Sequence, residues 1–105
     1  MAQFDVYRNK NANSRVDIPF LLDVQSDLLA HIDTRVVIPL AKAGSFSGPP
    51  GATLNPLFEF GGERCILLTP MLAGISKKEL GTKAGTLGDR RFDIVAAIDI
   101  LISGV

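Results

Sequence analysis

The chain has few of the residues from which catalytic and metal sites are most often built. Its 105 residues include one cysteine, one histidine and no tryptophan. A single cysteine cannot form an internal disulfide, and with one histidine it cannot complete a structural zinc site. The 11 basic and 11 acidic residues cancel, whereas proteins that bind nucleic acid through its phosphates usually carry a basic excess. These shortages favour a reducing compartment and argue against phosphate neutralisation as the main activity.

Long apolar runs are also missing. The most apolar stretch, residues 94–102, is interrupted by Asp99, and a membrane-spanning helix needs about 20 apolar residues. The first 16 residues contain charged side chains and no apolar segment of signal-peptide length. We therefore expect a cytoplasmic protein with no membrane partner.

Apolar residues are nevertheless abundant. They make up 47% of the chain, and the mean hydropathy is +0.27, which excludes a disordered protein. A chain of this length can bury one core. We expect one domain covering residues 1–105.

Alternation and β-branched residues predict a mainly β fold. The period-two pattern at residues 3–8 indicates a strand, and residues 18–24 and 35–40 are further strand candidates. A hairpin is expected from residues 57–60, the Gly61-Gly62 turn and residues 64–69. Residues 71–75 suggest a short strand, and the glycine-containing residues 77–88 suggest a connector.

The periodicity changes near the carboxyl end. From Asp89 onward, apolar residues recur at helical spacing, and Asp99 and Ser103 lie on the opposite face. This helix is apolar on more than one side, which suggests that a partner subunit covers part of it. Two long irregular segments, residues 8–17 and 43–56, complete the pattern.

No arrangement of residues typical of a catalytic or nucleotide-binding site is present. GxGxxG, Walker and HExxH motifs are absent from the sequence. His31 stands alone and fits a solvated or structural histidine better than a general base. Cys65 lies in an apolar run and fits a buried free thiol, and the Arg90-Arg91 pair fits the solvated start of a helix. We expect no catalytic residue, cofactor or metal site.

Four segments together resemble the CcdB toxins of bacterial toxin–antitoxin modules. They are Gln3-Phe4-x-Val6-Tyr7, the Asp-Val-Gln-Ser-Asp block at 23–27, the Arg-Val-Val-Ile-Pro-Leu block at 35–40, and the ending at residues 97–105. The similarity follows the whole chain in the same order. The two central blocks are fairly specific when they occur together.

The resemblance implies both a fold and a mode of action. CcdB proteins have an SH3-like barrel of the CcdB/MazF/Kid type, with a small additional sheet and a C-terminal α-helix. They are homodimers that catalyse no reaction and poison DNA gyrase by trapping its A subunit on cleaved DNA. A CcdA antitoxin neutralises them through a disordered C-terminal segment, and the complex contacts operator DNA mainly through the antitoxin.

The gyrase-contacting positions of the family transfer to seven residues of this chain. They are Leu28, Leu29, Asp99, Ile102, Ser103, Gly104 and Val105. Asp99 replaces a polar amide of the best-known member. Ser103 replaces a tryptophan that stacks on a gyrase arginine, a contact typically worth about 0.5–2 kcal/mol, so potency is in question more than identity.

Two other functions stay open at this stage. One is a MazF-like endoribonuclease, motivated by the shared fold and by Arg35, Arg90 and Arg91, although the zero net charge argues against it. The other is a degenerate relative that binds an antitoxin but does not poison gyrase, motivated by Ser103. For neutralisation, we expect residues 8–17 and 43–55 to lie near the path of the antitoxin.

Overall fold

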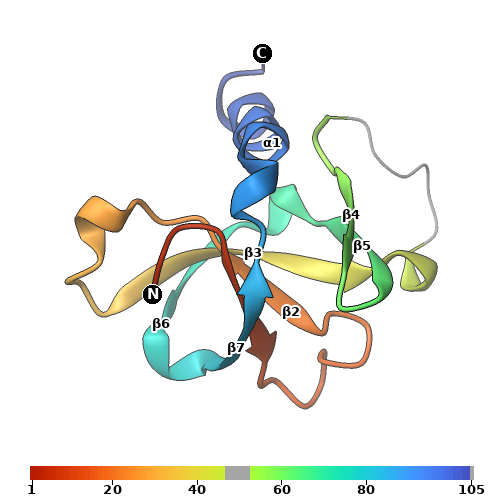
Figure 1. Ribbon diagram of the computed structural model, residues 1–105, viewed down its shortest axis with the longest axis horizontal. Coiled ribbons are helices and arrows are strands. Elements are labelled where there is room, and N and C mark those ends of the chain that lie inside the picture. The colour runs from red at the N-terminus through yellow and green to blue at the C-terminus, as the bar shows by residue number, and fades with distance from the viewer. Residues whose placement is uncertain (47–52, 105) are drawn as a thin grey trace.

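A curled antiparallel sheet forms most of the computed structural model, which describes residues 1–46 and 53–104 (Figure 1). Its strands run in the spatial order β4-β5-β3-β2-β1-β7, and β6 pairs with the free part of β3. The strands are β1 (Asp5–Asn9), β2 (Phe20–Asp23), β3 (Thr34–Lys42), β4 (Leu57–Phe60), β5 (Glu63–Leu67), β6 (Ala73–Ser76) and β7 (Leu80–Thr86). The half-barrel is followed by α1 (Arg91–Ser103), which stands against one face of the sheet with its carboxyl end pointing away.

The predicted mainly β fold with a C-terminal helix is confirmed. The strands expected at residues 3–8, 18–24 and 35–40, the hairpin and the short strand near residue 75 all form, with ends shifted by a few residues. The additional β4–β5 hairpin is hydrogen-bonded to the end of β3, at Leu40–Lys42, and is therefore continuous with the main sheet.

Strand β3 organises the sheet because it is long enough to pair with three others. Along one edge, residues Val37 to Leu40 of β3 pair with β2. The opposite edge pairs with β6 from Thr34 to Val37 and then with β5 from Leu40 to Lys42. One strand thus carries both the half-barrel and the hairpin.

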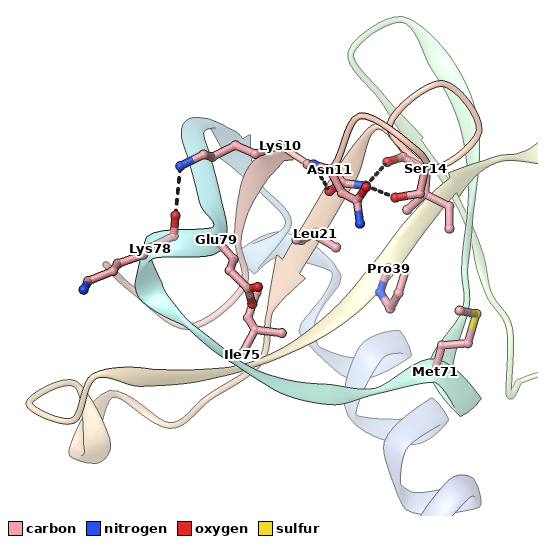
Figure 2. Close-up of a pocket in the computed structure, with 11 residues that line it drawn as sticks. Lys10, Asn11, Ser14, Leu21, Pro39, Met71, Ile75, Lys78 and Glu79 are labelled. Carbon is pink, nitrogen blue, oxygen red and sulfur yellow. Dashed lines mark hydrogen bonds between the residues drawn. The ribbon is translucent and has the colours of Figure 1, made fainter.

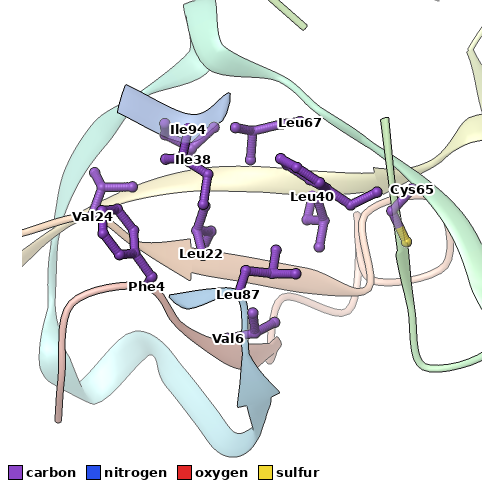
Figure 3. Packing of buried hydrophobic residues seen from close by; sticks show 11 residues of the cluster. Phe4, Val6, Leu22, Val24, Ile38, Leu40, Cys65, Leu67, Leu87 and Ile94 are labelled. Atoms are coloured by element: carbon purple, nitrogen blue, oxygen red, sulfur yellow. The ribbon is translucent and has the colours of Figure 1, made fainter. Parts of the chain in front are cut away.

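Both faces of the central strands are apolar, since each face covers a separate core. Successive side chains of a strand point to opposite faces. On one face Leu22 and Ile38 pack with Ile94 of α1 in the larger core (Figure 3). On the inner face of the half-barrel Tyr7 and Val37 pack in a smaller core. The nearly continuous apolar runs of β2 and β3 follow from this two-sided burial.

The prediction that residues 77–88 form only a connector is wrong. Leu80–Thr86 form β7, which pairs with β1 through a register that shifts twice. Two of the three glycines in this segment lie in β7, where close packing leaves little room for a side chain. A Cβ at Gly81 would lie 2.7 Å from the backbone oxygen of Arg8, and one at Gly85 would lie 2.9 Å from the ring of Phe60.

Gly81→Ala is therefore expected to destabilise the protein by about 1–3 kcal/mol, as overpacking against rigid backbone commonly does. The matched control is Gly74→Ala in β6, where an added Cβ meets nothing within 4 Å. Urea denaturation followed by circular dichroism would measure both. Equal stability of the two variants would contradict this explanation of the β7 glycines.

Candidate functional site

The first two of the seven transferred positions form an exposed apolar turn between β2 and β3. Asp27–Leu29 adopt a single turn of 3₁₀-helix, η1, and the Ser26 hydroxyl caps it by accepting a hydrogen bond from the Leu28 amide at 3.2 Å. Leu28 is 87% exposed and Leu29 is 47% exposed. The Gln-Ser-Asp sequence accounts for the turn, because Ser and Asp are favoured where a helix begins. The Ser26 cap fixes the turn, and no residue of η1 is buried, so both leucines face solvent.

The amino-terminal segment and a lysine tie this turn to the rest of the molecule. The Gln3 amide donates to Asp27 Oδ1 at 2.7 Å, and Lys77 Nζ donates to the Ala30 carbonyl at 3.1 Å. Phe4 has a φ of 70°, a left-handed conformation that is unusual for a bulky residue. Its backbone is held on both sides, since its amide donates to Asp23 and its carbonyl accepts from Leu87. This conformation brings Gln3 to the turn.

The remaining positions lie on the carboxyl-terminal part of α1. Ile102 is 75% exposed, and Asp99, Ser103 and Gly104 are also exposed. Gly104 ends the helix in the left-handed conformation, with a φ of 75°, and its amide donates to the Ile100 carbonyl at 3.0 Å. Glycine is favoured there because it adopts this conformation without steric cost. Val105 lies outside the described residues.

Within one protomer, the two groups of positions are separate. The η1 turn lies within the β2–β3 connection, whereas the end of α1 points away from the sheet (Figure 1). The structure therefore brings Leu28 together with Leu29, and Asp99 together with Ile102, Ser103 and Gly104. A single continuous surface made of all of them would need a second molecule.

One exposed aromatic residue on the same helix was missed by sequence reasoning. Phe92 is 90% exposed, and it precedes Asp99 by seven residues and Ser103 by eleven. This spacing places the three side chains on one face of the helix. The same spacing is present in the sequence and is the signal that could have identified Phe92.

A buried ion pair lies behind the η1 turn. The Arg35 guanidinium donates to Asp23 Oδ2 through Nε at 3.0 Å and also through Nη2, and both side chains are fully buried. Burial raises the pKa of the Asp23 carboxyl, and the hydrogen bonds from Arg35 and from the Gln25 amide act against that rise. Arg35 is thus a structural residue, and its side chain cannot contribute to a basic surface.

The other chemically reactive candidates also have structural surroundings. Cys65 is fully buried, and burial raises the pKa of its thiol, which disfavours the reactive thiolate. Arg90 pairs with Asp93 at 2.9 Å, and Arg91 donates to Gln3 Oε1 at 3.1 Å. His31 is exposed in the connection that follows η1. The interpretations of Cys65 as a buried thiol and of the arginine pair as the solvated start of a helix are confirmed.

A groove opens on the inner side of the half-barrel, below the β1–β2 loop (Figure 2). Its volume is about 530 Å³, and its floor is apolar. Ile18, Leu21, Pro39, Met71 and Ile75 supply apolar lining, while Lys10 and Lys78 lie at its edge. The loop is shaped by Asn9, whose side-chain amide donates to Ser14 Oγ at 3.0 Å and to the Ile18 carbonyl at 2.8 Å.

The structure places the two irregular segments differently with respect to this groove. Residues 8–17 include several of its lining residues. The second segment, residues 43–55, is also expected near the antitoxin path. Its residues 47–52 lie outside the described part of the chain, so the structure places only residues 43–46 and 53–55.

Residues 1–46 and 53–104 are the part of the chain that the structure describes. No helix within these ranges has the length and apolarity needed to cross a membrane. These ranges also contain no group of three or more histidine, cysteine or acidic residues placed to hold a metal ion.

The comparison with protein families agrees with the observed fold. The family model described as CcdB protein matches residues 3–104, which is nearly the whole chain. This chain belongs to the CcdB family, whose members are toxins of toxin–antitoxin modules.

Proposed function

We propose that this protein poisons DNA gyrase by binding the A subunit while that subunit holds cleaved DNA. The observation that carries the proposal is the exposure of Leu28, Leu29 and Ile102 at positions where the family resemblance expects gyrase contacts. Apolar surface gains about 25 cal/mol per Å² when it is removed from water. Exposed leucine and isoleucine side chains, gathered on a short turn and a helix end, are therefore suited to a protein partner.

The active species is a homodimer. Leu101 is an exposed apolar residue of α1, and α1 packs against the η3 turn (Thr69–Met71). A two-fold axis near them would cover this surface and place two helix ends side by side. Gyrase would then meet residues from both chains, which accounts for the separation of the turn and the tail within one protomer.

The toxin acts by binding and catalyses no reaction. Trapping a cleaved-DNA intermediate requires only that the toxin bind that state of gyrase more tightly than the religated state. Cys65 is buried and the Asp23–Arg35 pair is buried as well, so neither presents an exposed group for RNA cleavage. Ser103 lacks the aromatic ring of the best-known member, so Ile102 and the Leu28–Leu29 turn contribute a larger share of the affinity.

Leu28→Ser is expected to weaken binding to the gyrase A subunit by about tenfold or more, because burial of a leucine side chain contributes about 1.5–3 kcal/mol. The matched control is Val16→Ser, which removes an apolar side chain that is 69% exposed in the β1–β2 loop. Isothermal titration calorimetry with the purified A subunit gives both affinities.

Equal affinities of the Leu28→Ser and Val16→Ser variants would contradict the placement of Leu28 in the gyrase surface. Both side chains are largely exposed and neither is counted in a core. The two variants should therefore unfold at nearly the same temperature, so that a difference in affinity reports on the interface alone.

A CcdA-like antitoxin neutralises the toxin through its disordered C-terminal segment, and operator DNA is contacted through the antitoxin in the complex. The groove below residues 8–17 supports a path for such a segment. Disordered segments bind by burying apolar side chains along extended grooves and become ordered as they bind. The apolar floor with lysines at its edge has this character.

Replacing residues 10–13 with two glycines is expected to weaken antitoxin binding at least about tenfold while gyrase binding is retained. The shortened loop can close because the side chains of Asn9 and Ser14 already lie 3.0 Å apart. Surface plasmon resonance with an antitoxin peptide and with the gyrase A subunit would measure both effects. Leu28→Ser serves as the control that loses affinity for gyrase. If the loop variant binds the antitoxin peptide as tightly as the wild type does, the β1–β2 loop does not contact the antitoxin.

A further inference from the structure

The Leu28–Leu29 turn has no core of its own. It consists of three residues, none of them buried, and Leu28 is almost fully in water. Helical turns this short are not stable by themselves. The orientation of the two leucines must therefore be set by hydrogen bonds from neighbouring elements.

Gln25 supplies the most buried of these hydrogen bonds. Gln25 lies two residues after the end of β2 and is 5% exposed. The amide nitrogen Nε2 donates to the Leu29 carbonyl at 2.9 Å, and the amide oxygen Oε1 accepts from the Val36 amide on β3 at 3.0 Å. The two partners, one acceptor and one donor, fix the orientation of the amide group.

The backbone of Gln25 is anchored as well. Its amide donates to Asp23 Oδ1 at 3.0 Å, and the other oxygen of that carboxylate is held by Arg35. A chain of hydrogen bonds thus runs from the buried Asp23–Arg35 pair through Gln25 to the carbonyl of Leu29. Both polar atoms of the Gln25 side-chain amide form hydrogen bonds, so this side chain links strand β3 to Leu29, the last residue of the turn.

We propose that Gln25 is a positioning residue for gyrase binding: it holds the Leu28–Leu29 turn in its binding conformation and does not itself contact the partner. The proposal rests on the gyrase-binding function proposed above. Ordering a flexible loop opposes association, so a loop that is already ordered in the free protein binds more tightly. Gln25 is nearly inaccessible to a partner protein. Its effect on gyrase affinity therefore comes from the position in which it holds Leu28 and Leu29.

Gln25→Glu is the sharpest test, because it preserves the shape of the side chain. One carboxylate oxygen can still accept from the Val36 amide, but the other faces the Leu29 carbonyl, and two acceptors repel each other. At pH 7.5 we expect affinity for the gyrase A subunit to fall about tenfold. Hydrogen exchange should accelerate at the amides of Leu29, Ala30 and Ile32, whose own hydrogen bonds lie within the turn.

Three further variants separate positioning from a general loss of stability. Ile38→Val shortens a fully buried side chain on β3 without touching the turn, so it should lower the unfolding temperature and leave the gyrase affinity unchanged. Where Gln25→Glu fails to fold, Gln25→Met takes its place, since it removes both hydrogen bonds without adding charge. In a Leu28→Ser/Leu29→Ser background, the Gln25 substitution should cause no further loss of affinity.

The possible results distinguish failure of this proposal from failure of the proposed function. If the wild-type protein does not bind the gyrase A subunit, the proposed function is overturned. If the double serine variant binds gyrase as tightly as the wild type, the turn is not a gyrase contact, and positioning by Gln25 is overturned while gyrase binding itself stands. If the double serine variant loses affinity and the Gln25 substitution alone does not, only positioning by Gln25 is overturned. An equal loss from the Gln25 substitution with and without the leucines would also overturn it, because Gln25 would then act elsewhere.

Discussion

Deleting residues 103–105 is expected to reduce the trapping of cleaved DNA by gyrase about tenfold or more, because it removes the tail positions at which the family resemblance places gyrase contacts. The deletion removes the exposed Ser103 and Gly104 together with Val105. It leaves Ile94 and Ala97, the buried residues that attach α1 to the sheet, in place. Growth arrest on expression, and linear DNA in a cleavage assay, measure the loss.

The fold of the truncated protein should be unchanged. Gly104 contributes one backbone hydrogen bond, to Ile100, at the end of the helix. Circular dichroism and sedimentation should therefore give the wild-type spectrum and the wild-type oligomeric state. Full toxicity of the deletion variant would show that the tail is dispensable, and would leave the Leu28–Leu29 turn as the main gyrase contact.

Arg35→Met is expected to destabilise the protein by about 3–5 kcal/mol, because it leaves the buried Asp23 carboxylate without its partner. The second variant, Asp23→Asn/Arg35→Met, removes both charges but keeps an acceptor for the Gln25 amide. It should recover most of the lost stability, since replacing both partners of a buried pair is often nearly neutral. Urea denaturation gives the free energy of unfolding for both.

The pH dependence of Arg35→Met follows from the same pair. Burial raises the pKa of Asp23, and loss of the Arg35 hydrogen bonds removes the largest opposing effect. The folded variant would then bind a proton that the unfolded chain has released at neutral pH. Its stability should therefore increase relative to wild type as the pH falls toward about 5. A deficit that does not change between pH 7 and 5 would contradict this account of the buried carboxylate.

Most strands could be predicted from the sequence because their residue types match their surroundings. Residues 36–38 are β-branched and apolar, and they lie in the central strand β3. β7 could not be predicted in this way. Its glycines serve close contacts with Arg8 and Phe60, and those partners are distant in the sequence.

The candidate site was predictable in identity but not in geometry. The resemblance named Leu28 and Leu29, but only the structure shows that both project from one short turn. The hydrogen bonds of Gln3, Gln25 and Lys77 to this turn join elements that no local pattern connects. For Arg35 the sequence suggested a functional role that the structure does not support. The endoribonuclease alternative placed it on a basic surface, but its side chain is buried with Asp23.

The measurement that tests gyrase poisoning most directly is a cleavage assay with the purified protein, gyrase, ATP and supercoiled plasmid. Proteinase treatment after denaturation releases linear DNA from trapped complexes. We predict that linear DNA accumulates with toxin concentration, and that the antitoxin segment reverses the effect. Loss of supercoiling activity without linear DNA would contradict poisoning. No effect on gyrase would identify a degenerate member of the family, and cleavage of added RNA instead would point to an endoribonuclease.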